Sequence, residues 1–138
     1  MSPGQIEPSE EFENAFWYFL KALRVLSHDA EAQCEEMDNY NAPWEIQNDV
    51  AEGSLALLRS STSYLTWEQT ERMTELATAL RALPQEAIAP KGMVTTNHAG
   101  CFVAMNHPAW VSLREIAEQL LVLLEPAIKR NEAFFQNQ

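Results

Sequence analysis

Apolar residues recur at steps of three and four along most of this 138-residue chain, and this spacing favours helices over strands. The clearest stripe lies near the N-terminus and consists of Phe12, Phe16, Phe19, Leu23, Leu26, Ala30, Cys34 and Met37. Such steps place every member on one face of a helix of about seven turns. Ser9 is a suitable N-cap, because acidic residues follow it at the positive end of the helix dipole. The pattern predicts a first helix from about Ser9 to Asp38.

A second and a third helix follow from local start signals. Pro43 suits the first turn of a helix that has Asn41 or the next residue at its cap and ends within residues 59–63. Thr66 and Gln69 have the spacing of a capping box, in which each side chain satisfies a free backbone donor at the helix start. The third helix therefore begins at Thr66 and stops before the next proline.

The chain between the third helix and the last one is rich in proline, glycine and small residues. Residues 84–107 are predicted to form a long irregular connection, in which residues 97–105 could be a short helix or a strand. A fourth helix should begin near Pro108 or Ser112. Pro126 should kink or close it, which leaves the last two phenylalanines on a short extension.

These signals predict an all-α protein, an up-down four-helix bundle-like single domain with a long irregular connection between helices three and four. Residues 1–8 form a flexible lead-in, and residues 9–138 form the domain. The chain start lacks the basic residues and apolar run of a secretory signal, and no apolar stretch approaches the roughly 18 residues that span a bilayer. We therefore expect a soluble protein.

Negative charge is concentrated in residues 29–52, which we call the acidic segment. It holds eight carboxylates and no lysine or arginine, in a chain whose net charge is −11. A strongly acidic surface repels phosphate backbones and anionic lipids, so we expect neither nucleic acid nor a membrane as a partner. A basic protein is the natural complement.

The acidic segment supplies a predicted partner-binding site. Its residues are Glu31, Glu35, Asp38, Tyr40, Trp44, Glu45, Asp49 and Glu52. Helical spacing places three of the acids in a row on the first helix and three in a row on the second, with the two aromatics between them. Charged rims steer a partner and buried aromatics hold it. The leading hypothesis is an immunity or antitoxin-like inhibitor of a bacterial toxin; a plain acidic, solubilising surface is the structural alternative.

The second hypothesis is a magnesium-dependent enzyme. Glu35-x-x-Asp38 and Asp49-x-x-Glu52 place two carboxylate pairs on consecutive helices, an arrangement that can hold Mg²⁺ for phosphate chemistry. It resembles the motif of all-α nucleoside-triphosphate pyrophosphohydrolases, which is Glu-x-x-Glu, a spacer and Glu-x-x-Asp. The acid types and the spacer differ, and no lysine lies nearby to receive a phosphate. We assign no catalytic residue, metal ligand or cofactor from the sequence.

Three soft ligands lie in or beside the irregular connection. His98, Cys101 and His107 could hold zinc with Cys34 or a water, or form a cysteine–histidine nucleophile pair, whereas a buried thiol and turn histidines are the simpler interpretation. Two cysteines are too few for a disulfide framework, so we expect reduced thiols and a cytoplasmic, bacterial protein. The apolar surface of residues 16–25 is either core or the seam of a homodimer.

Overall fold

The chain is all-helical in the computed structural model, which describes residues 8–37, 41–60 and 64–137. Over these ranges it has eight helices and no strand. The helices are α1 (Pro8–Ser27), α2 (Ala30–Glu36), α3 (Ala42–Ser60), α4 (Trp67–Arg81), α5 (Gln85–Ile88), α6 (His98–Met105), α7 (Ala109–Leu123) and α8 (Glu125–Gln136). The predicted all-α class is confirmed.

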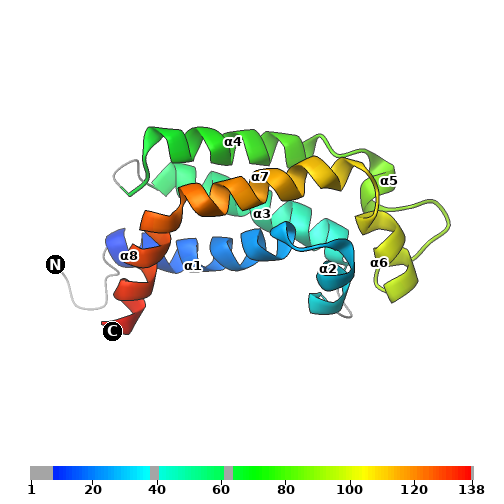
Figure 1. Cartoon of the computed structure of the whole chain (residues 1–138), viewed down its shortest axis with the longest axis horizontal. Helices are drawn as coiled ribbons and strands as arrows, with labels where there is room; N and C mark the ends of the chain where they lie inside the picture. Colours follow the sequence, from blue (N-terminus) through cyan, green and yellow to red (C-terminus); the bar gives the residue numbers. More distant parts are fainter. Residues whose placement is uncertain (1–7, 38–40, 61–63, 138) are drawn as a thin grey trace.

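Four long helices, α1, α3, α4 and α7, run along the long axis of the molecule (Figure 1). α1 packs against α3 and α7, and α4 packs against the same two helices. Their chain direction alternates, and α2, α5 and α6 lie at one end while α8 lies at the other (Figure 1). The finer assignment to the four-helix bundles stays a prediction. No helix of the described ranges is long and apolar enough to cross a membrane.

The core consists of the apolar faces that the spacing predicts. Its largest fully buried side chains are Phe12, Phe16, Phe19, Leu23, Leu26, Ile46, Leu57, Met73, Leu76, Leu80, Met105 and Trp110. Trp110 also satisfies its polar atom, since its Nε1 donates to the Ala87 carbonyl at 3.0 Å and thereby fixes α5 against α7. Trp17 and Tyr18, by contrast, remain exposed on α1.

The first helix is shorter than the apolar stripe predicts. α1 ends at Ser27 and α2 begins at Ala30, so the prediction of one helix as far as Asp38 is wrong, and Asp38 itself lies outside the described residues. Asp29 provides the physical reason, because its carboxylate caps α2 by accepting a hydrogen bond from the Ala32 amide at 2.9 Å. The stripe continues to be buried on both helices, and only the backbone changes course.

Gln33 joins the two helices across this break. Its side chain is fully buried, and its Nε2 donates to the carbonyls of Val25 at 3.1 Å and Leu26 at 3.0 Å, in the last turn of α1. Its Oε1 accepts a hydrogen bond of 2.8 Å from Nη2 of Arg114, which also donates to the Met105 carbonyl. Arg114 on α7 therefore connects α2 with the end of α6, and Gln33 connects α2 with the end of α1.

Two predicted helix starts are confirmed. Asn41 precedes α3 and its Oδ1 accepts a hydrogen bond from the Trp44 amide at 3.3 Å. Thr66 and Gln69 form the capping box at the start of α4, with bonds of 2.8 and 3.1 Å. The same Gln69 donates to the Leu123 carbonyl at 3.1 Å, so this cap also ties α4 to the end of α7.

The predicted irregular connection over residues 84–107 is only partly irregular, since it contains α5 and α6. Asn97 caps α6 by accepting a hydrogen bond from the Gly100 amide at 3.1 Å. A Cβ at Gly100 would lie 2.1 Å from the carbonyl oxygen of Val94, so the loop before α6 packs directly onto that glycine. These backbone contacts act together with the buried side chains of Cys101, Ala104 and Met105 to hold α6 in place.

The C-terminal part forms a full helix where a short extension is predicted. Pro108 precedes α7, as expected, and Pro126 lies in the first turn of α8, so it starts a new helix as α7 closes. α8 contacts α1 through a buried cluster: Arg130 Nε donates to the Glu13 carboxylate at 2.7 Å, and the Asn131 amide donates to the same side chain at 3.0 Å. The Glu13 side chain is only 4% exposed.

Candidate functional site

The structure places most of the predicted site on two helices. Asp38 and Tyr40 lie outside the described residues. The other members lie on α2 or α3 and are Glu31, Glu35, Trp44, Glu45, Asp49 and Glu52. Glu45 is half-buried, and the rest are exposed, including Trp44 at 48%. The acids therefore do reach solvent, although they belong to two separate short rows.

Two acids of the acidic segment are already paired. Glu52 binds Arg81 of α4 at 2.8 Å between Oε1 and Nη2, and Glu36 binds Nδ1 of His28 at 2.7 Å. Both pairs are exposed on the surface, where such contacts contribute little to stability. The segment thus receives one arginine and one histidine as partners from its surroundings, and the pairing with Arg81 could not be seen from the distribution of charge along the sequence.

A groove between α1 and α3 is the feature that joins part of this site to an apolar surface. It has a volume of about 600 Å³ and an apolar floor. Its lining residues are Ala15, Tyr18, Phe19, Lys21, Ala22, Val25, Met37, Ile46, Asn48, Asp49, Glu52, Gly53 and Ala56. Two members of the predicted acidic site therefore form one rim of an apolar hollow.

The groove owes its shape to small residues on both helices. Ala15 and Ala22 face it from α1, and Gly53 and Ala56 face it from α3. A Cβ at Gly53 would lie 3.2 Å from the Phe19 ring, so the two helices approach closely at that point. With so little side-chain volume above the helix contact, the surface between the two helices is hollow.

Asp49 is the acid best placed to meet a ligand in this groove. Among the described residues it has no hydrogen-bond or ion-pair partner, unlike its neighbour Glu52. Partial burial raises the pKa of the Asp49 carboxyl above its ordinary value. A carboxylate that has lost part of its hydration without a protein partner favours an external cation.

This environment gives a testable stability effect for Asp49→Asn. Because the folded pKa is raised, ionisation of Asp49 opposes folding as the pH rises through that value. We expect the variant to melt slightly higher than the wild type at about pH 7 and at the same temperature at about pH 3, where both side chains are neutral. Glu68→Gln on exposed α4 is the control, and equal melting of Asp49→Asn and wild type at neutral pH would contradict the prediction.

An aromatic cluster adjoins the groove at the side of α1. Trp17 stacks edge-on with Tyr18 at 5.0 Å and with Phe135 of α8 at 6.4 Å between ring centroids. Lys21 Nζ lies over the Trp17 ring, 4.6 Å from its centroid. Tyr18, which is 68% exposed, belongs both to this cluster and to the groove. Aromatic surface therefore continues from α8 to the edge of the groove.

A second hollow, of about 620 Å³, lies where α3 and α4 meet. Its lining includes Leu58, Leu65 and Trp67, and among the described lining residues the single carboxylate is that of Glu71. Trp67 is 78% exposed. This hollow lacks the concentration of charge that makes the groove between α1 and α3 the stronger candidate.

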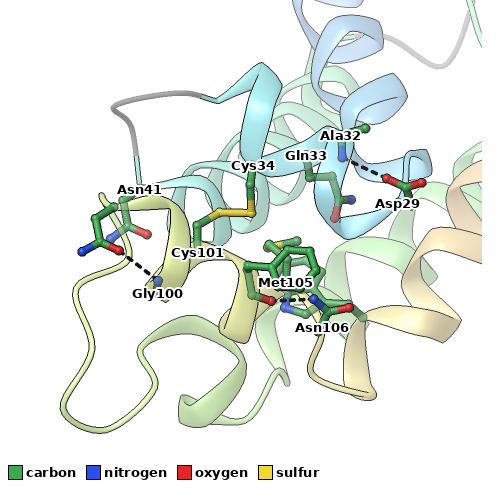
Figure 2. Close-up of a disulfide and its surroundings, with 12 residues drawn as sticks. Asp29, Ala32, Gln33, Cys34, Asn41, Gly100, Cys101, Met105 and Asn106 are labelled. Carbon is green, nitrogen blue, oxygen red and sulfur yellow. Dashed lines mark hydrogen bonds between the residues drawn. A yellow bond between two sulfur atoms is a disulfide. The ribbon is translucent and has the colours of Figure 1, made fainter.

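The cysteines form a disulfide, contrary to the prediction of reduced thiols. Cys34 of α2 and Cys101 of α6 are paired, with their Cα atoms 6.0 Å apart (Figure 2). Cys101 is therefore neither a zinc ligand nor a nucleophile in this state. His107 Nδ1 accepts a hydrogen bond from the Ala109 amide at 3.0 Å, and the His98 ring stacks on the Phe102 ring.

The magnesium hypothesis requires the four acids of the two pairs to converge. Within residues 8–37, 41–60 and 64–137, no group of three or more His, Cys, Asp or Glu side chains could hold a metal ion. Asp38 lies outside these ranges, and Glu52 is bound to Arg81. No observation favours the magnesium-dependent activity, which stays an untested prediction.

Comparison with known proteins does not assign this chain to a family. No protein-family model, curated protein or solved structure matches the chain. The candidate site therefore stands on its geometry alone.

The half of the groove that α1 contributes is missing from the sequence prediction. Tyr18 and Lys21 are not acidic and lie outside the acidic segment, so neither belongs to the predicted rows. A signal existed in the small residues, because Ala15 and Ala22 are seven apart and fall on one helix face. Only the packing of α1 on α3 shows that this face is next to Asp49.

Proposed function

We propose that this protein binds a basic protein partner through the groove between α1 and α3 together with the described acids of the predicted site on α2 and α3. The observation that carries the proposal is the exposed Asp49 carboxylate, which has no partner among the described residues and lies at the edge of an apolar hollow. Apolar contact area supplies affinity in such a site, and the acids supply steering and selectivity.

The most concrete form of this proposal is an immunity or antitoxin-like inhibitor of a bacterial toxin. The support is physical: a small chain with a net charge of −11 and a compact, acid-rimmed binding surface suits the neutralisation of a cationic enzyme. An up-down four-helix bundle formed by the long helices would act as the rigid scaffold. Under this proposal the protein is no enzyme.

The predicted cytoplasmic location stays a prediction. The Cys34–Cys101 disulfide argues against it, since disulfides persist mainly in oxidising compartments. Binding to a secreted or periplasmic basic protein is compatible with the same surface.

Affinity capture with matched charge variants tests the proposal. The site variant carries Glu31→Gln, Glu35→Gln, Glu45→Gln and Asp49→Asn. The control carries Glu68→Gln, Glu71→Gln, Glu115→Gln and Glu118→Gln on exposed positions of α4 and α7. Both variants lose four negative charges from the same total of −11, so their net charges are equal.

We expect the wild type and the control variant, but not the site variant, to capture the same basic protein from extracts of the source organism. The purified partner should then bind directly in calorimetry, with an affinity that falls as salt rises. Equal capture by the two variants, or a captured protein that is not basic, would refute the proposed site.

A further inference from the structure

The groove between α1 and α3 lies over a pair of antiparallel helices. Its lining on α1 extends from Ala15 to Val25, and its lining on α3 extends back from Ala56 to Ile46. At 1.5 Å per residue the α1 side measures about 15 Å, which is the length of roughly three turns of a helix. The small residues on the floor allow a third backbone to come close.

Backbone hydrogen bonding restricts what can occupy this groove. Both walls are helices, whose interior backbone groups are bonded within the helix, and no strand edge is present in the described ranges. An extended peptide laid on the apolar floor would bury amide and carbonyl groups without hydrogen-bond partners, which is unfavourable. A helix satisfies these groups internally and therefore suits the groove.

Charge indicates the chemistry of the occupant and its orientation. The acids lie on the α3 rim, where Asp49 has no partner among the described residues and Asn48 is exposed beside it. On the α1 rim, the Lys21 ammonium lies over the Trp17 ring, and Tyr18 provides exposed aromatic surface. Cations of the occupant should thus line the α3 side, and its apolar side chains should face the floor and Tyr18.

A second copy of the chain fits this groove poorly. Each copy has a net charge of −11, so electrostatic repulsion opposes the association of two copies. The same repulsion opposes nucleic acid and anionic lipid. Charge complementarity leaves a basic polypeptide as the favoured occupant.

We propose that the groove between α1 and α3 receives an amphipathic α-helix of the partner, with lysines or arginines along the edge that faces α3. This inference rests on the proposed function and specifies which element of the basic partner is recognised. Recognition follows the helix-in-groove mode, in which residues spaced three, four and seven apart provide the apolar anchors.

Two synthetic peptides of identical composition, made of leucine, alanine and lysine, provide the test. In the first, leucines occupy one helix face with lysines along one edge; in the second, the same residues are arranged so that no face forms. We expect the amphipathic peptide to bind at least about tenfold tighter in fluorescence anisotropy. It should also gain helical circular dichroism in the complex.

A matched pair of protein variants tests whether the peptide binds in the groove. Ala56 is an exposed groove residue of α3, and Ala133 is an exposed residue of α8 outside the groove lining. We expect Ala56→Arg to lower the affinity for the amphipathic peptide by at least about tenfold, because it adds bulk and positive charge to the groove. Ala133→Arg should leave this affinity unchanged. Both variants should melt like the wild type, since both positions are exposed.

The outcomes separate this inference from the proposed function. Equal affinity for the two peptides, no gain of helix, or equal effects of the two arginine substitutions would overturn the helix-in-groove inference. If capture of a basic partner still failed only in the site variant, the proposed function would stand without it. Loss of that capture difference would overturn the proposed function, whatever the peptides do.

Discussion

Opening the Cys34–Cys101 disulfide is expected to lower the free energy of unfolding by about 4 kcal/mol. The two cysteines are 67 residues apart in the chain, so the bond closes a long loop and removes much conformational freedom from the unfolded state. In the folded state it joins two short helices, α2 and α6 (Figure 2). Urea unfolding with and without a phosphine reductant measures the difference.

The double variant Cys34→Ala/Cys101→Ala is the control for the reductant. It should unfold at the same low urea concentration as the reduced wild type and should not respond to the reductant. Hydrogen exchange should rise first in residues 30–36 and 98–105, the two helices that the bond joins. An unfolding midpoint that is the same in the oxidised and the reduced protein would contradict the prediction.

The second large effect is expected at the ion pair between α1 and α8. Arg130→Met should lower the free energy of unfolding by about 3–5 kcal/mol, because it leaves the Glu13 carboxylate buried without its cation. Glu13→Gln should lower it less. The Arg130 side chain is 39% exposed, and it can still donate to the Tyr64 carbonyl, which lies 2.8 Å away in the wild-type protein. Thermal unfolding and urea unfolding of the two variants measure this order of stability.

Two further variants keep this prediction specific. Lys129→Met removes the neighbouring cation of an exposed pair and should change stability by no more than about 0.5 kcal/mol. The double variant Glu13→Met/Arg130→Met should be more stable than Arg130→Met alone, because no unpaired buried charge remains. A double variant that is less stable than Arg130→Met would show that the pair's charge is not the source of the loss.

The helix starts were predictable from the sequence because their causes are local. Asn41 and Thr66 each bond to backbone three residues away, so a short stretch of sequence contains the whole interaction. The break between α1 and α2 has a local cause in the Asp29 cap, but the buried Gln33 amide that joins the two helices reaches back to Leu26 and is itself bound by Arg114, 81 residues away. No short stretch of sequence contains that partner.

The candidate site was predictable only on one side for the same reason. The charge of Asp49 and Glu52 is visible in the sequence, whereas their neighbours across the groove come from α1. The pairing of Glu52 with Arg81 spans 29 residues, and the disulfide spans 67. Periodicity identifies which residues face inward, but it does not identify which exposed faces are neighbours.

The hydrogen bonds of Arg114 affect how the fold responds when the disulfide is reduced. Burial lowers the pKa of Arg114 and the Asp29 charge opposes that shift, so the guanidinium remains a cation. Because it holds Gln33 of α2 and Met105 of α6, it fastens the same two helices that the sulfur bridge joins. After transfer to a reducing compartment the protein would thus keep its fold, and only its free energy of unfolding would decrease.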